Sequence, residues 1–191
     1  MKFKKFKFKK VRSTNNTAIR IIKKTHYKYG MVISESQTNG KGQYGRKWIS
    51  HKGNLFVTFF HEVNKIKLSI ATITKLNCLL IKKLISKYTN KKILYKKPND
   101  LFIDKKKICG ILQEIIFMKN KKYLITGIGI NINKSPYIKK CPTTNLNKLT
   151  NKHIKINKIE KSLKQIFENN LLKMYNLKAV SYTHLTLPTK S

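Results

Sequence analysis

Residues 93–117, ILYKKPNDLFIDKKKICGILQEIIF, and residues 121–133, KKYLITGIGININ, decide the expected fold. Both segments carry short apolar stretches of strand length, rich in isoleucine and phenylalanine and separated by polar residues. We predict three or four strands joined by tight turns, one of them at Asp104-Lys105.

The flanking segments add helices and further strands. Residues 55–60 are typical of a buried strand, Met31 to Ser34 of a short one, and the alternation of Lys and Phe in residues 3–8 indicates an edge strand. Apolar residues at helical spacing predict helices after residues 13–16, over about 70–84 and over about 158–175. This order is neither a regular βαβ alternation nor an all-β array, so we predict an α+β fold with a mixed sheet in one domain, residues 1–179.

The last twelve residues, VSYTHLTLPTKS at 180–191, abandon the Lys, Asn and Ile bias of the rest of the chain. They resemble translated sequencing-adapter sequence. We expect a non-native tail here and a missing natural C-terminus.

The charge balance is extreme, with 43 basic against 7 acidic residues and a formal net charge of +36. Such a balance raises the possibility of a nucleic-acid binding module, with Phe3, Phe6 and Phe8 stacking on bases. However, almost all of the basic residues are lysines, whereas arginine is the residue suited to bidentate phosphate and base contacts. A solvated lysine surface is the favoured interpretation, and the same phenylalanines serve equally well as one face of a strand.

Cysteine and histidine patterns point to no disulfide framework and no metal site. The three cysteines are widely spaced and form no C-x-x-C pair, which fits a reducing cytoplasm. His26, His51, His61 and His153 have no metal-site spacing, and we expect no protein-held metal. No apolar run approaches the ~20 residues that span a bilayer.

Three segments carry residues suited to chemistry. Residues 40–46, GKGQYGR, combine three glycines with two cations, which suits a phosphate, although a flexible surface loop is the alternative. The whole stretch 37–54 is predicted to be too glycine-rich for regular structure. Asp100, Asp104 and Glu114 fall within one short segment, where Asp104 makes a turn and only Lys107 of the lysine run 105–107 is singled out. Glycines in GIGININ weaken a strand unless a ligand or backbone approaches closely.

Taken in order, four segments resemble the biotin protein ligase family: RSTNNTA, SESQTNGKGQYGRKWISHKGNLFVTFF, KKPNDLFIDKKKICGILQE and GIGININ. They cover about residues 11 to 133. The resemblance implies a catalytic domain like that of class II aminoacyl-tRNA synthetases, in which a mixed sheet carries the site on one face and helices pack on the other.

The resemblance also implies the reaction and its participants. Biotin and ATP would give biotinyl-5'-AMP and pyrophosphate, and a lysine of a biotin carboxyl carrier protein, from an acetyl-CoA or related carboxylase, would then accept biotin. Mg²⁺ is expected through the ATP phosphates, and the enzyme is expected in the cytoplasm. A lipoate or octanoate ligase of the same fold is the nearest rival, although it generally lacks the GxGxxGRxW loop.

Site residues follow from matching the motifs of the family. Lys107 is the expected principal catalytic cation, Ser13, Thr14 and Gln37 would bind the ureido ring of biotin, and Trp48 and Asn131 would lie at adenine. The implied catalytic set is Lys107, Arg46, Lys41 and Asp100; the implied biotin-binding set is Ser13, Thr14, Asn15, Gln37, Gly40, Gly110 and Gly127; the implied adenylate-binding set is Gly42, Gln43, Gly45, Trp48, Asn99 and Asn131.

The sequence departs from the family in several places. Gln43 and Tyr44 stand where the family usually has arginine, so we hypothesise faster escape of biotinyl-AMP from this loop. Lys97 stands where an aromatic residue often precedes proline. We expect neither the winged-helix segment that precedes the catalytic domain in repressor members nor the small C-terminal β domain.

Overall fold

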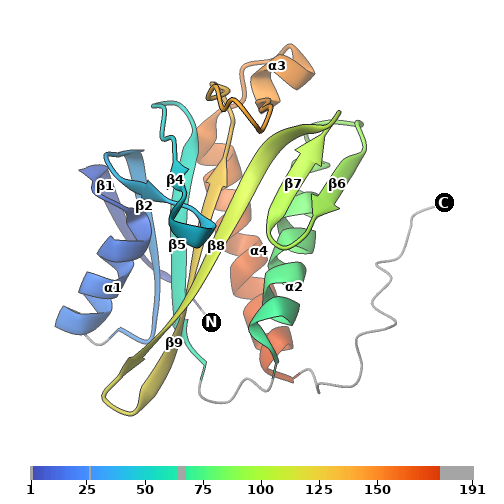
Figure 1. Ribbon diagram of the computed structural model, residues 1–191. Helices are drawn as coiled ribbons and strands as arrows, with labels where there is room; N and C mark the ends of the chain where they lie inside the picture. Colours follow the sequence, from blue (N-terminus) through green and yellow to red (C-terminus); the bar gives the residue numbers. More distant parts are fainter. Residues whose placement is uncertain (1, 26, 64–67, 177–191) are drawn as a thin grey trace.

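The computed structural model describes residues 2–25, 27–63 and 68–176, so the expected tail at 180–191 lies outside the described residues. Seven strands form one sheet in the order β1-β2-β5-β9-β8-β7-β6, and β3 and β4 form a separate hairpin (Figure 1). The elements are β1 Lys4–Val11, α1 Thr14–Thr25, β2 Tyr29–Gln37, β3 Gly40–Lys41, the 3₁₀ turn η1 Gln43–Gly45, β4 Lys47–Trp48, β5 Leu55–Glu62, α2 Ile70–Ile85, β6 Ile93–Lys96, β7 Asp100–Ile103, β8 Lys106–Met118, β9 Lys121–Ile130, α3 Leu146–Thr150 and α4 Ile156–Asn176.

The predicted α+β class and mixed sheet are confirmed. β1 pairs with β2 in parallel, whereas every other pair in the sheet is antiparallel. The segment 93–130 forms four consecutive strands, and the predicted turn at Asp104 and Lys105 is present with φ values of 48° and 60°. A second turn of this kind joins β8 to β9 at Lys119 and Asn120, and the positive φ of both central residues is the geometry of a tight hairpin turn.

The N-terminal strand β1 lies at an edge of the sheet, as the Lys and Phe alternation predicts. Its phenylalanines serve the core. Phe3 is buried and meets the Phe59 ring edge to face at 5.0 Å, while Phe6 packs on Phe60. Phe8 is half-buried in the same apolar cluster as Phe6. Packing against the core thus accounts for one buried ring and two half-buried rings, as expected for one face of a strand.

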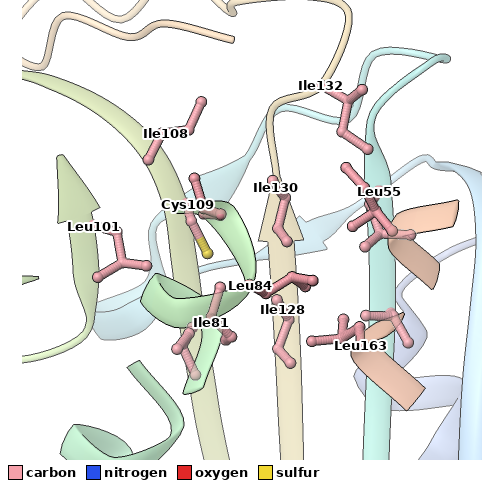
Figure 2. Packing of buried hydrophobic residues seen from close by; sticks show 14 of the residues in the cluster. Leu55, Ile81, Leu84, Leu101, Ile108, Cys109, Ile128, Ile130, Ile132 and Leu163 are labelled. Atoms are coloured by element: carbon pink, nitrogen blue, oxygen red, sulfur yellow. The ribbon is translucent and has the colours of Figure 1, made fainter. Parts of the chain in front are cut away.

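The larger helices cover one face of the sheet and enclose the main core. The buried face of α2 packs on β8 and β9, with Ile81 and Leu84 over Cys109 and Ile128 (Figure 2). α4 lies beside α2 and adds Ile159, Leu163 and Phe167 to the same core, where the Phe167 ring stacks on Phe59 at 4.2 Å. Full burial of each such aliphatic or aromatic side chain stabilises the fold by roughly 1.5–3 kcal/mol.

The expectation that all helices pack on one face is wrong for α1. Ala18 and Ile22 of α1 are fully buried against Val32, Phe60 and Tyr123, which point to the sheet face opposite α2 and α4. The physical reason is the apolar stripe of α1, which finds a matching set of side chains on β2, β5 and β9. As a result α1 covers only the part of this face that lies lower in Figure 1, and its first turn borders the cavity on the uncovered part.

The glycine-rich stretch 37–54 also contains more regular structure than predicted. Gly40 pairs with Trp48 and Lys41 with Lys47 in a short antiparallel hairpin, and η1 turns the chain between its two strands. The Gly42 amide donates to the Arg46 carbonyl at 2.7 Å, which closes the turn. Glycines thus permit a tight hairpin here, and the hairpin projects over the uncovered part of the sheet.

Candidate functional site

A cavity of about 710 Å³ lies on the sheet face that α2 and α4 do not cover. Its floor is formed by β8 and β9, and its walls by the start of α1, the hairpin region 41–49, residues 96–100 and the segment 136–143. It brings together all of the predicted site residues except Gly40 and Gly45, which line an adjoining hollow of about 530 Å³ with residues 112–114.

Lys107 is the best-positioned cation of the cavity. Its Nζ lies 2.8 Å from Asp100 Oδ2 and 5.3 Å from the centre of the Trp48 ring. Its side chain is 18% exposed and that of Asp100 22%, whereas Lys105 and Lys106 are exposed as expected of a solvated run. The Lys107 backbone donates to the Pro142 carbonyl at 2.8 Å and accepts from the Thr144 amide at 2.9 Å. These contacts hold the ammonium group in one place before any ligand binds.

The indole of Trp48 rests on a pair of glycines in neighbouring strands. Gly110 of β8 and Gly129 of β9 are register partners, and a Cβ at Gly110 would lie 2.7 Å from Trp48 Cζ3. A Cβ at Gly129 would overlap the same ring. The resemblance led us to expect the Gly110 backbone to meet biotin, but Trp48 occupies that approach in this structure. Both glycines are needed because only a strand without side chains admits the indole.

Gln37 connects the start of α1 to the hairpin. Its Oε1 accepts from the Thr14 amide at 2.7 Å and from Thr14 Oγ1 at 3.0 Å, and its Nε2 donates to Ser50 Oγ at 3.0 Å. The orientation of the Gln37 amide is thereby fixed. One Gln37 Nε2 hydrogen remains for a ligand, and the Thr14 amide, an orphan donor of a helix start, is satisfied within the protein.

Asn15 is held on both sides of its amide. Its Nδ2 donates to Glu114 Oε2 at 2.7 Å, and its Oδ1 accepts from Thr58 Oγ1 at 2.6 Å. The amide lies directly on Gly127, where a Cβ would overlap it. The predicted biotin residues Asn15 and Gly127 are therefore in contact with each other. Sequence reasoning noted the position of Glu114 but gave it no role.

The tip of the hairpin presents cations at the mouth of the cavity. Lys41 and Arg46 are both exposed, and neither forms an ion pair with an acidic side chain in the described part of the chain. Tyr44, with φ of 55°, and Gly45, with φ of 72°, adopt the left-handed conformation that turns the tip. Free positive charge beside a glycine-rich turn suits an anionic group.

Two further asparagines shape the nucleotide side predicted for the cavity. Asn99 exchanges hydrogen bonds with Ile111: its Nδ2 donates to the Ile111 carbonyl, and the Ile111 amide donates to the Asn99 carbonyl at 3.0 Å. Asn131 follows β9 and lines the cavity. A residue that no prediction named, Asn54, binds the turn after Asn131 with its side chain. The Gly-Asn-Leu sequence before a buried strand was the available pointer to it.

Three buried polar atoms at the cavity have no hydrogen-bond partner within residues 2–25, 27–63 and 68–176: Ser13 Oγ, Trp48 Nε1 and Asp100 Oδ1. Buried polar atoms are nearly always hydrogen-bonded. One donor, one acceptor and one hydroxyl left without partners give the cavity a polar lining that suits a polar ligand. The neighbouring cations Lys41, Arg46 and Lys107 add a preference for negative charge.

The fold and the cavity are thus those of a protein with a polar, cation-rich site on the open face of a mixed sheet. Comparison with known proteins is specific: the model of the biotin/lipoate A/B protein ligase family matches residues 7–131. The chain belongs to this family.

Individual relatives agree with the family match. The bifunctional ligase/repressor BirA of Bacillus subtilis is 29% identical over 126 residues, which are 65% of this chain and 39% of that protein. A biotin protein ligase from Aquifex aeolicus in complex with biotin and ATP superimposes with a TM-score of 0.77 at 27% identity, covering 92% of this chain and 73% of that one. A biotin protein ligase from Leishmania major shares the fold, with a TM-score of 0.74, 23% identity and coverage of 98% and 87%. The chain spans about two fifths of the length of the Bacillus relative.

The described residues contain neither a cluster of metal ligands nor a membrane-spanning helix. In that part of the chain, no group of three or more His, Cys, Asp or Glu side chains is placed to hold a metal ion. No described helix is long and apolar enough to cross a membrane. His51 and His153 are exposed, whereas His61 is buried in β5, away from the cavity.

Proposed function

We propose that the chain is an ATP-dependent ligase that forms biotinyl-5'-AMP from biotin and ATP and transfers biotin to a lysine of a carrier protein. The cavity carries this proposal, because it gathers residues of all four sequence motifs around three unpartnered buried polar atoms. The Aquifex relative, which was solved with biotin and ATP, supports the choice of ligands.

In the first step a carboxylate oxygen of biotin attacks the α-phosphorus of ATP, and the bond to the β-phosphate breaks to release pyrophosphate. Two anions must be brought together and negative charge builds on the phosphoryl oxygens, so fixed cations are the main requirement. Lys107 meets this need. Because Asp100 and Trp48 already hold its ammonium group, little reorganisation is required when the substrates bind. Lys41 and Arg46 would bind the phosphates from the mouth of the cavity.

The biotin end of the cavity is assigned to the first turn of α1 and its neighbours. Ser13 Oγ is free to bind a ureido group, and Thr14 and Gln37 present fixed polar atoms beside it. Asn15 acts chiefly by keeping this region in place, since both ends of its amide are engaged. Trp48 and Asn131 are assigned to the adenine end, with the backbone of residues 42–45 and Asn99 lining the path between.

Mg²⁺ would accompany the ATP phosphates and neutralise part of their charge. The residues present fit a metal that arrives with the nucleotide better than a resident one: Asp100 is the only acidic side chain lining the cavity in the described structure, and its Oδ1 is unpartnered. Asp100 and water would complete the coordination of such an ion.

In the second step the amine of an acceptor lysine attacks the carbonyl carbon of the adenylate, AMP leaves, and an amide forms. Lys107 would stabilise the negative charge on the carbonyl oxygen. Lys47, Lys96, Lys97 and Lys140 surround the cavity, which would attract an acidic carrier domain over long range. We propose a biotin carboxyl carrier protein as this partner, in a reducing cytoplasm, consistent with the three free cysteines.

Pyrophosphate exchange into ATP tests the activation step. The full chain is incubated with labelled pyrophosphate, ATP and Mg²⁺, with biotin, lipoate or octanoate supplied separately. Exchange with biotin alone is expected. Exchange with only lipoate or octanoate would reassign the substrate within the family, and exchange with none of the three would contradict the proposed activity.

A further inference from the structure

Asn54 makes an unusual set of hydrogen bonds for one buried side chain. Its Oδ1 accepts from three consecutive backbone amides, those of Ile132, Asn133 and Lys134, each at 3.0 Å. Its Nδ2 donates to the Lys134 carbonyl at 2.9 Å and to Asn131 Oδ1 at 3.5 Å. Asn54 is 2% exposed and lies just before β5.

These partners leave Asn54 only one orientation. Three backbone N–H groups require an acceptor on one side of the amide, and a backbone carbonyl requires a donor on the other. The Nδ2 group therefore faces Asn131, which must turn its own oxygen toward Asn54. Asn131 Nδ2 is then directed away from Asn54, and it makes no hydrogen bond to the described residues while Asn131 lines the cavity.

The backbone of Asn131 is fixed independently of Asn54. Its amide donates to the Ile108 carbonyl at 2.9 Å, and its carbonyl accepts from the Leu146 amide at 3.1 Å. Only the side-chain amide of Asn131 is free to take either of two orientations. Asn54 selects between them, because the alternative would place two N–H groups face to face.

We infer that Asn54 is a positioning residue that sets the Asn131 amide to offer a hydrogen-bond donor to the nucleotide base in the cavity. This inference rests on the proposed function for the identity of the nucleotide. The base would be recognised through an acceptor, a ring nitrogen in the case of adenine, and not through its amino group. Asn54 itself does not line the cavity.

The test exchanges the donor of Asn54 for an acceptor. Asn54→Asp keeps an oxygen for the three amides but places a second oxygen against Asn131 Oδ1 and the Lys134 carbonyl. Asn131 would then reverse its amide and present oxygen to the base. We expect the KM for ATP in pyrophosphate exchange and the Kd for ATP by calorimetry to rise about tenfold, the value of one ordinary hydrogen bond, with kcat and the KM for biotin unchanged.

Two further variants separate this effect from loss of the turn. Asn147→Asp removes the bond from Asn147 Nδ2 to Asn133 Oδ1, which supports the same turn from α3 without touching the Asn131 side chain, and ATP binding should stay at the wild-type value. In an Asn131→Ala background, Asn54→Asp should cause no further loss, because the two residues act through one group. An additional tenfold loss there would overturn the inference.

If Asn54→Asp does not fold, a second variant tests the same hydrogen-bond donor. Asn131→Asp leaves the turn intact and replaces the donor by oxygen, so it should also raise the Kd for ATP about tenfold; wild-type affinity in this variant would overturn the inference. If the wild-type chain binds ATP but shows no biotin-dependent exchange, the proposed ligase activity fails while the Asn54 effect on ATP affinity is still measured. If the wild-type chain binds no ATP, both are wrong.

Discussion

Replacing Lys107 tests the central catalytic assignment. Lys107→Met keeps an unbranched side chain over the Trp48 ring but removes the ammonium group 2.8 Å from Asp100. Loss of one preorganised charge-stabilising group typically lowers the rate by about 100- to 1000-fold, or ~2.7–4 kcal/mol. We expect a decrease of this size in kcat for pyrophosphate exchange. Stability should change by less, on the order of 1 kcal/mol, because Asp100 keeps partial access to water.

The assay must measure the two half-reactions separately. Pyrophosphate exchange measures the activation step, and transfer from synthetic biotinyl-AMP to a carrier domain measures the second step. Lys107→Met should lower the rate of both. Lys106→Met is the matched control, since Lys106 is the adjacent exposed lysine and does not line the cavity. Rates for Lys107→Met within threefold of the control would refute the assignment.

Other predictions concern the hairpin, the thiols and the buried histidine. Gln43→Arg should slow release of biotinyl-AMP about tenfold by adding a charged donor at the mouth, measured by filter retention of labelled adenylate; equal release rates would contradict our hypothesis. Cys141, which lines the cavity, should react with a thiol reagent in the native chain and be protected by biotin plus ATP. Cys78 and Cys109 should not react, because both are buried and burial raises the pKa of the Cys78 thiol to about 12. Reaction of all three thiols before unfolding would contradict the burial of Cys78 and Cys109. Burial lowers the pKa of His61 from 6.5 to about 3, so between these pH values only the unfolded chain takes up the proton. The free energy of unfolding should therefore fall by about 1.4 kcal/mol for each unit that the pH is lowered from 6.5 toward 3; urea titrations in which wild type and His61→Leu show the same pH slope would exclude this.

Much of the fold is predictable from local pattern. The strands of the 93–130 segment are bounded by turns with polar residues, and α2 is marked by apolar residues at helical spacing, so their positions follow from period and turn chemistry. The face that α1 covers is not predictable in this way. An apolar stripe such as Ala18 and Ile22 shows that a helix packs, but its side of the sheet depends on pairing between strands distant in sequence.

The sequence predicts which residues form the site better than it predicts the contacts between them. Motif order places Lys107, Asp100 and Trp48 in one cavity, and the structure adds that Lys107 contacts both of the others. A glycine in a strand indicates close approach by some group, but sequence does not say which. At Gly110 the group is the Trp48 ring, and at Gly127 it is the Asn15 amide. Both occupants come from segments far away in the chain.

Lysines and acidic residues have different roles on the surface and at the site. Lysines outnumber acids so heavily that most have no acidic partner, and an exposed lysine in water contributes little to stability. The acidic residues are few, and some of them join separate elements of the fold: Glu160 pairs with Lys5 and so ties β1 to α4, and Glu168 of α4 accepts from the Phe3 amide at 2.7 Å. Asp100 and Glu114 are used in the same way inside the site, one to hold a cation and the other to hold an amide. Four of the seven acidic residues thus hold parts of the structure together, and two of these four, Asp100 and Glu114, lie at the cavity and its adjoining hollow.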